Sequence, residues 1–157
     1  MEYNILINRD TLQRAVDTRN HYMGEALKRH DVNADIIQSS CDDNALFDIF
    51  LATACNELTS SVALRFSNIA CTVTKDFVEI TFECTNKDCS TLIPLLKQSI
   101  TDYLVNELAL QWLLLRHPDM AQSYISLRTS LYNNVQQQFA KIYRGQKRRR
   151  ATDLAGI

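Results

Sequence analysis

Residues 91–116 have the sequence TLIPLLKQSITDYLVNELALQWLLLR, and this stretch decides what kind of fold the chain can form. Its apolar side chains recur at the four-residue steps that place them on one face of an α-helix: Leu92, Leu96, Ile100, Leu104, Leu108 and Trp112. Toward its end the stretch is apolar nearly all round, which is typical of a helix that is covered on every side. We therefore expect a helix here that lies either at the centre of a bundle or against another subunit.

A second long helix is expected directly after the first. His117-Pro118-Asp119 predicts a tight corner, because proline stops the preceding helix. Apolar residues then recur at steps of three or four, and Gly145 is expected to end the helix: Met120, Tyr124, Leu127, Leu131, Val135, Phe139 and Ile142. The last two helices should therefore be long and antiparallel.

The first half of the chain predicts one short strand, two helices and a hairpin. Tyr3–Asn8 alternates as a strand does, a helix capped by Asp10 or Thr11 should run to about His30, and another should cover about Asp43 to Ala63. Over residues 69–84 the apolar period changes to two, which predicts a β-hairpin with one dry face. Two strands alone are marginally stable, so the N-terminal strand, a helix or a neighbouring copy must complete them.

The length and the composition favour a single helical domain. The chain has 157 residues with only 3 Gly and 2 Pro, which is little turn-forming material for a many-stranded fold. We predict a mainly α fold, a helical bundle of about four helices with a small β-hairpin. The bundle should span residues 1–143 as one domain, and residues 144–157 should form a basic C-terminal tail without fixed structure.

Charge is distributed unevenly along the chain. The net charge is −1, with 17 basic and 18 acidic residues. Six of the basic residues and one acidic residue lie from Lys141 onward, so residues 1–140 keep 11 basic and 17 acidic residues, a net of −6. An acidic body with a basic tail of +5 indicates contact with an acidic surface.

The basic tail is the sharpest local signal in the sequence. Its candidate partner-binding residues are Arg144, Lys147, Arg148, Arg149 and Arg150. They suit a solvated tail, docking on an acidic protein surface, or salt-dependent and sequence-blind contact with DNA. Stacking on single strands is disfavoured because no aromatic residue interleaves with the basic run. Base-specific readout is disfavoured because the regular helices are acidic or neutral.

Catalytic and metal-binding patterns are not found in the sequence. It contains no Walker loop, GxGxxG, GxSxG or HExxH, so we predict neither an enzyme nor a cofactor or metal. The alternatives are a metal site built from Cys41, Cys84, Cys89 and a histidine, or a metal-binding pair at Asp42-Asp43. An enzyme with an unrecognised site would also have to use Asp42, Asp43 or a histidine. The preferred interpretation of Asp42-Asp43 is a helix start.

The cysteines and the hydropathy indicate a cytoplasmic origin. Five cysteines, an odd number without CxxC spacing, favour free thiols in a reducing cytoplasm over a disulfide framework. No signal peptide is recognised, and no apolar run reaches the roughly 20 residues that span a bilayer. We therefore expect no membrane partner.

Aromatic and leucine residues of the last two helices are candidates for a subunit interface. Trp112 within its leucine-rich stretch is normally a core residue, and an interface position is the alternative, since Trp and Tyr are favoured as anchors. The same ambiguity holds for the tyrosines of the last helix. The candidate interface residues are Trp112, Leu115, Tyr124, Tyr132 and Tyr143.

The order of these elements resembles a group of small proteins encoded in the structural gene blocks of Bacteroidetes phages and prophages, which are taken as head–tail connector or neck proteins. Four segments carry the likeness, and the last helix with its arginine run completes it over roughly residues 3–150: RNHYMGEALK (19–28), DDNALFDIFLATACNEL (42–58), the hairpin over 72–82, and LIPLLKQSITDYLVNELALQWLL (92–114).

The resemblance implies a structural role in a virion. It implies a homo-oligomeric ring of about a dozen copies (a dodecamer) in the neck, joined to the portal protein and to the adjacent neck and tail proteins. The chain would be made in the host bacterial cytoplasm and would end at the head–tail junction. The alternative function is that of a nucleic-acid-associated helical accessory module that binds through the basic tail.

Overall fold

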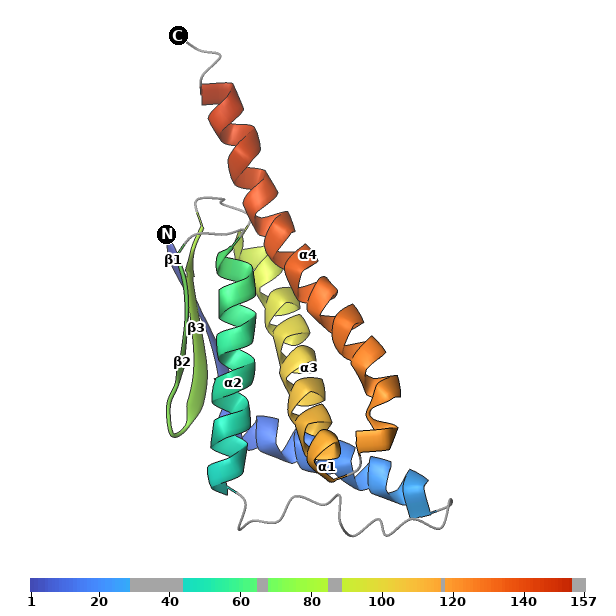
Figure 1. Ribbon diagram of the computed structural model, residues 1–157. Helices are drawn as coiled ribbons and strands as arrows, with labels where there is room; N and C mark the ends of the chain where they lie inside the picture. The colour runs from blue at the N-terminus through green and yellow to red at the C-terminus, as the bar shows by residue number, and fades with distance from the viewer. Residues whose placement is uncertain (29–43, 65–67, 85–88, 117, 154–157) are drawn as a thin grey trace.

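The computed structural model describes residues 1–28, 44–64, 68–84, 89–116 and 118–153, the last ten by their backbone alone (Figure 1). The elements in chain order are β1 (Glu2–Asn8), α1 (Arg9–Lys28), α2 (Asn44–Ala63), β2 (Ile69–Val73), β3 (Phe77–Glu83), α3 (Cys89–Arg116), a 3-10 turn (Pro118–Met120) and α4 (Gln122–Asp153). The predicted fold class, mainly α with a small β component, is confirmed, and α3 and α4 run antiparallel.

The N-terminal strand completes the hairpin. The sheet has the order β1-β3-β2, and both pairs are antiparallel. Ile5 and Cys71 flank Ile80 from the two sides, so the dry face of the hairpin continues into β1. Of the three predicted ways to complete the hairpin, the structure therefore has two: the chain's own first residues pair with β3, and helix α2 packs against β2.

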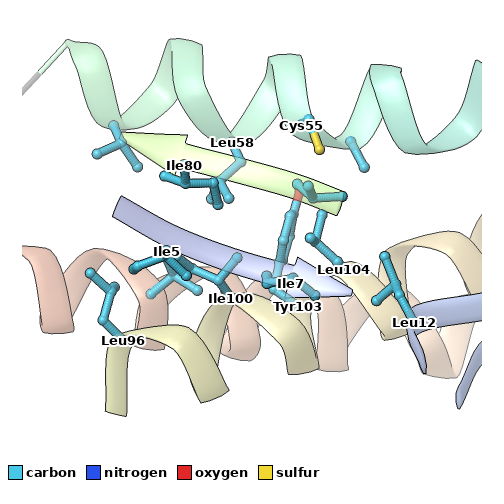
Figure 2. Close-up of a cluster of buried hydrophobic side chains, with 14 of the residues drawn as sticks. Ile5, Ile7, Leu12, Cys55, Leu58, Ile80, Leu96, Ile100, Tyr103 and Leu104 are labelled. Atoms are coloured by element: carbon cyan, nitrogen blue, oxygen red, sulfur yellow. The ribbon is translucent and has the colours of Figure 1, made fainter. Parts of the chain in front are cut away.

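The core lies between the sheet and the helices. Side chains from β1, β3, α1, α2 and α3 meet there (Figure 2). Helix α3 occupies the centre, because it contacts α1, α2, α4 and β1. Of the apolar row predicted for this helix, Leu92 is partly buried and the other five residues are fully buried: Leu96, Ile100, Leu104, Leu108 and Trp112. Tyr103, which is not part of that row, is also fully buried.

Helix α1 begins earlier than the sequence predicts. The predicted caps, Asp10 and Thr11, both lie inside the helix, and the cap is Asn8, whose Oδ1 accepts a hydrogen bond from the backbone N–H of Thr11 at 2.9 Å. Asn8 is also the last residue of β1, so one residue ends the strand and caps the helix. The predicted caps of α2 lie outside the described residues.

Helix α4 is longer than predicted, because Gly145 does not end it. The helix continues to Asp153, so most of the predicted tail is a helical extension. Glycine in a helix costs only about 1 kcal/mol relative to alanine, and the flanking Gln, Lys, Arg and Ala residues are strong helix formers. Ten residues follow Tyr143 in α4, which corresponds to roughly 15 Å of helix. Figure 1 shows this part of α4 projecting past the other elements.

Candidate functional site

A cluster of three charged side chains joins α2, α3 and α4. Arg128 of α4 lies between two carboxylates: its Nε is 2.5 Å from Glu107 Oε2 of α3, and its Nη2 is 2.6 Å from Glu57 Oε2 of α2. The Glu57 side chain is 48% exposed and that of Glu107 only 1%. We call Glu57, Glu107 and Arg128 the ion cluster. It links an exposed carboxylate to a buried one.

The two oxygens of the buried Glu107 carboxylate have different partners. Oε2 forms an ion pair with Arg128 but accepts no hydrogen bond from the described residues, and Oε1 accepts a hydrogen bond from Gln111 Nε2 of the next helical turn at 2.7 Å. A buried charge is tolerated when it is paired and its remaining lone pairs are satisfied. Glu107 therefore depends on the position of α4, since the only ion pair described for it comes from that helix.

Tyr103 of α3 adds a neutral hydroxyl to the ion cluster. Burial, reinforced by the negative charge of Glu107, raises the pKa of Tyr103 to about 12. For Arg128, burial lowers the pKa, but attraction to Glu107, Tyr103 and Glu57 outweighs it, so the pKa of Arg128 lies above its usual value. The Arg128 guanidinium therefore stays positively charged, and its charge is paired with carboxylates of the chain itself.

A cavity of about 300 Å³ opens beside the ion cluster. Its lining is rich in hydroxyl groups: Glu57, Ser61, Tyr103, Arg128, Thr129 and Tyr132. Tyr132 packs against Tyr103 with ring centroids 6.0 Å apart, and its hydroxyl accepts a hydrogen bond from Gln136 at 2.6 Å. Because both carboxylates are engaged with Arg128, the arrangement suits holding three helices in register better than proton transfer.

A second, more apolar groove lies between α1, α3 and the start of α4. It measures about 460 Å³ and is lined by Ala15, Thr18, Arg19, Tyr22, Met23, Val105 and Tyr124. Tyr22 is 70% exposed, while Tyr124 is half-buried. The neighbouring Asn20 is fully buried, and neither its amide nor Arg19 Nε has a hydrogen-bond partner among the described residues. This groove therefore has polar groups near it that the described part of the chain leaves unsatisfied.

The predicted interface residues divide between the interior and the surface. Trp112 is fully buried and packs edge-on against Phe50 at 5.4 Å, so it takes the core position rather than the interface position. Tyr143 is half-buried and donates a hydrogen bond to the backbone oxygen of Glu83 at 3.1 Å. Tyr132 and Tyr124 line the cavity and the groove, respectively. Leu115 is the one candidate that is mostly exposed, at 58%.

The predicted basic tail forms the last turns of α4, beyond the contact that Tyr143 makes with the end of β3. The structure describes the backbone of this segment but not the side chains of Arg144 and Lys147–Arg150. Apart from Tyr143, which directly precedes it, the basic segment lies away from the other candidate residues, because the helix projects past the body (Figure 1).

Metal ligation was an alternative for several residues. Among the described residues, no group of three or more His, Cys, Asp and Glu side chains is arranged to hold a metal ion. Cys41, Asp42, Asp43, His30 and His117 lie outside the described part of the chain. Cys84 and Cys89 are both buried, one at each end of the segment that joins β3 to α3.

The ion cluster was missed in the sequence, although a signal for it exists. Glu107 stands as a lone acid in a stretch of α3 that is otherwise apolar nearly all round. A charge at such a position requires a partner from a neighbouring helix. Arg128 is the only basic residue between the corner at Pro118 and Lys141, so it is the one cation available in the first part of the antiparallel helix.

Comparisons with known proteins give no assignment. No family model, no curated protein and no solved structure matches this chain. None of the helices, as far as their residues are described, has the length and apolar character that crossing a membrane requires.

Proposed function

We propose that this chain is a structural virion protein of a tailed phage, which forms a homo-oligomeric ring in the neck and connects the portal and head to the tail. Its contacts would be with its own copies, with the portal protein and with adjacent neck and tail proteins. The projecting end of α4 is the observation that carries the proposal. A helix end that extends about 15 Å past the other described elements is available for a partner to receive.

Charge supports contact between copies. The residues up to 140 carry a net charge of −6, and the segment from Lys141 onward carries +5. Attraction between unlike surfaces steers association and fixes its register. The basic end of one copy therefore suits the acidic body of the next, and an acidic channel wall would let DNA pass without sticking.

Exposed apolar side chains near the corner between α3 and α4 support the same conclusion. Leu114 and Leu115 in the last turn of α3 are 38% and 58% exposed, and Ile125 and Leu127 in the first two turns of α4 are 37% and 38% exposed. Single exposed apolar residues are ordinary, whereas several within a short stretch are typical of contact surfaces.

Reversing the basic segment tests the proposal. The full chain should elute as an oligomer in size-exclusion chromatography with light scattering. A variant with Lys147→Glu, Arg148→Glu, Arg149→Glu and Arg150→Glu should shift toward the monomer. The matched control reverses three exposed cations of the body (Arg14→Glu, Lys75→Glu and Lys97→Glu) and should keep the oligomer. Equal oligomers in all three proteins would contradict a role of the basic end.

The second candidate function is a nucleic-acid-associated accessory module. It is favoured by one observation, the placement of Lys147–Arg150 on a helix that stands clear of the body. Such a helix could meet a phosphate backbone, and its binding would weaken steeply with salt. If the charge-reversed variant loses DNA binding but still assembles, this second function gains over the first.

A further inference from the structure

One face of the three-stranded sheet is left uncovered by the described helices. Figure 1 shows these helices on a single side of the sheet, where α2 contacts β2 and α3 contacts β1. On the opposite side the even-numbered residues of β1, from Glu2 to Asn8, are exposed, while Ile5 and Ile7 on the helix side are buried. We call this opposite side of β1, β2 and β3 the open face.

The charged residues of the open face are all acidic. The three strands contain Glu2, Glu79 and Glu83 and no lysine or arginine. All three glutamates lie on the open face, because they alternate along their strands with the buried side chains. None of them forms an ion pair within the described part of the chain. The open face therefore presents three carboxylates that the described residues do not neutralise.

Two of these carboxylates are forced close together. Glu2 and Glu83 are directly opposite each other in the sheet. The adjacent pair, Met1 and Cys84, exchanges both backbone hydrogen bonds, at 3.0 and 2.9 Å, so Glu2 and Glu83 form the kind of antiparallel pair whose side chains approach most closely. Asn68 donates a hydrogen bond to Glu83 at 2.8 Å but brings no positive charge. Because like charges directly opposite each other destabilise a sheet, a cation bound beside them would relieve the repulsion.

The open face also exposes apolar area beside its carboxylates. Leu6 is 44% exposed and Phe77 is 40% exposed. Leu6 is opposite Glu79 and Phe77 is opposite Asn8, so the two apolar side chains are diagonal neighbours on adjacent strands. Exposed apolar side chains next to unpaired charges are typical of a contact surface.

The acids of the helices are arranged differently. Asp48 of α2 forms an ion pair with Arg9, and the two carboxylates of the ion cluster share Arg128. These acids are paired within one copy, so they have less attraction left for an outside cation. The open face is therefore the part of the acidic body that best complements a basic partner.

The basic end of α4 has the matching charge, and one copy cannot deliver it to its own open face. The segment from Lys141 onward carries a net charge of +5. Its helix projects past the other elements on the side of the sheet that the helices occupy, so its backbone leads away from the open face of the same copy (Figure 1). A second copy is the source that can supply this segment.

We propose that the open face of one copy receives the basic end of α4 from a second copy, with the cations of Lys147–Arg150 set against Glu2, Glu79 and Glu83. This inference rests on the proposed function, for which it names the receiving surface. A contact between two different surfaces repeats head to tail, and it closes into a ring when the rotation between copies allows.

Neutralising the open face tests the contact in the full-length chain. A variant with Glu2→Gln, Glu79→Gln and Glu83→Gln should raise the apparent dissociation constant of the oligomer about tenfold or more, measured by light scattering over a dilution series. The matched control makes the same change in net charge at three exposed acids outside the sheet and should keep the original constant: Asp10→Asn, Asp102→Asn and Asp119→Asn. Circular dichroism checks that each variant is folded.

The outcomes separate this inference from the proposed function. If the unchanged chain forms oligomers that both variants weaken equally, or that neither variant weakens, the open face is not the receiving surface, while the ring proposal stands. If the unchanged chain is a monomer, the ring proposal is contradicted, and this inference falls with it.

Reversing both charged surfaces gives an independent check. A chain with Glu2→Lys, Glu79→Lys and Glu83→Lys should lose its oligomers, because its basic end then meets a basic face. Adding the reversed basic segment (Lys147→Glu, Arg148→Glu, Arg149→Glu and Arg150→Glu) restores opposite charges, so the combined variant should assemble again. A combined variant that is folded but stays monomeric, while the unchanged chain assembles, would overturn the inference.

Discussion

Two of the places at which helix α4 contacts the body differ in their chemistry. Near its middle, Val135, Phe139 and Ile142 are fully buried against the core, and Phe139 packs edge-on against Phe82 at 5.7 Å. Near its start, the helix is held by Arg128 of the ion cluster, while Leu127 beside it stays 38% exposed. The apolar contact is a source of stability, whereas the ion cluster fixes which residues of α3 and α4 lie opposite one another.

Loss of the apolar contact of α4 should have the largest effect on the free energy of unfolding. Phe139→Ala removes a fully buried ring from the contact between α4 and the sheet, so we expect a loss of about 3–5 kcal/mol in the free energy of unfolding. Urea denaturation followed by circular dichroism measures this loss. Leu127→Ala is the control on the same helix and should cost far less, because its side chain is partly exposed. Similar losses for the two variants would erase the distinction between the two places.

Loss of the ion pair between Arg128 and Glu107 should have the second-largest effect on the free energy of unfolding. Arg128→Ala leaves the carboxylate of Glu107 buried without its ion pair, so we expect a loss of about 1–3 kcal/mol, reduced from the fully buried case because the Arg128 side chain is 35% exposed. Glu107→Gln in the same chain should recover part of that loss, because it removes the unpaired charge. A double-mutant cycle measures the coupling. Additive losses would show that the two side chains act independently.

The outer half of the ion cluster should matter less. Glu57→Ala removes a carboxylate that is 48% exposed, so the expected loss is below about 1 kcal/mol. The loss should shrink further in high salt, which screens exposed pairs more than buried ones. Denaturation at low and high salt measures it. A loss as large as that of Arg128→Ala would mean that the exposed pair between Arg128 and Glu57 is the main interaction of the cluster.

Removal of the helix end should have the smallest effect on stability and a large effect on assembly. A chain that stops after Tyr143 keeps every packing contact described for α4, so its unfolding free energy should change by less than about 0.5 kcal/mol. Its oligomers should nevertheless dissociate, as light scattering would show. A strong loss of stability in a monomeric sample would mean that the end of α4 packs on its own body.

The repeat of apolar residues predicted the helices well, because apolar side chains at steps of three and four lie on the helix face that is buried. The core of α3 and the buried part of α4 lie at the predicted positions. The pairing of β1 with β3 was left open, since the residue pattern of a strand names its dry face but not its neighbour. The predicted end of α4 at Gly145 was wrong, because the helix formers around this single glycine outweigh its low helix propensity.

The candidate site was harder to predict than the fold. The ion cluster depends on three residues that are 21 to 71 positions apart, counted from Glu107 to Arg128 and from Glu57 to Arg128. Their meeting follows from how α3 and α4 pack, which no local pattern contains.

Native mass spectrometry of the full-length chain, combined with negative-stain electron microscopy, tests the central proposal most directly. Assembly through the projecting end of α4 predicts closed rings of one copy number, and a chain stopped after Tyr143 should be monomeric under the same conditions. A full-length chain that stays monomeric across the micromolar range, alone and mixed with portal protein, would contradict the account.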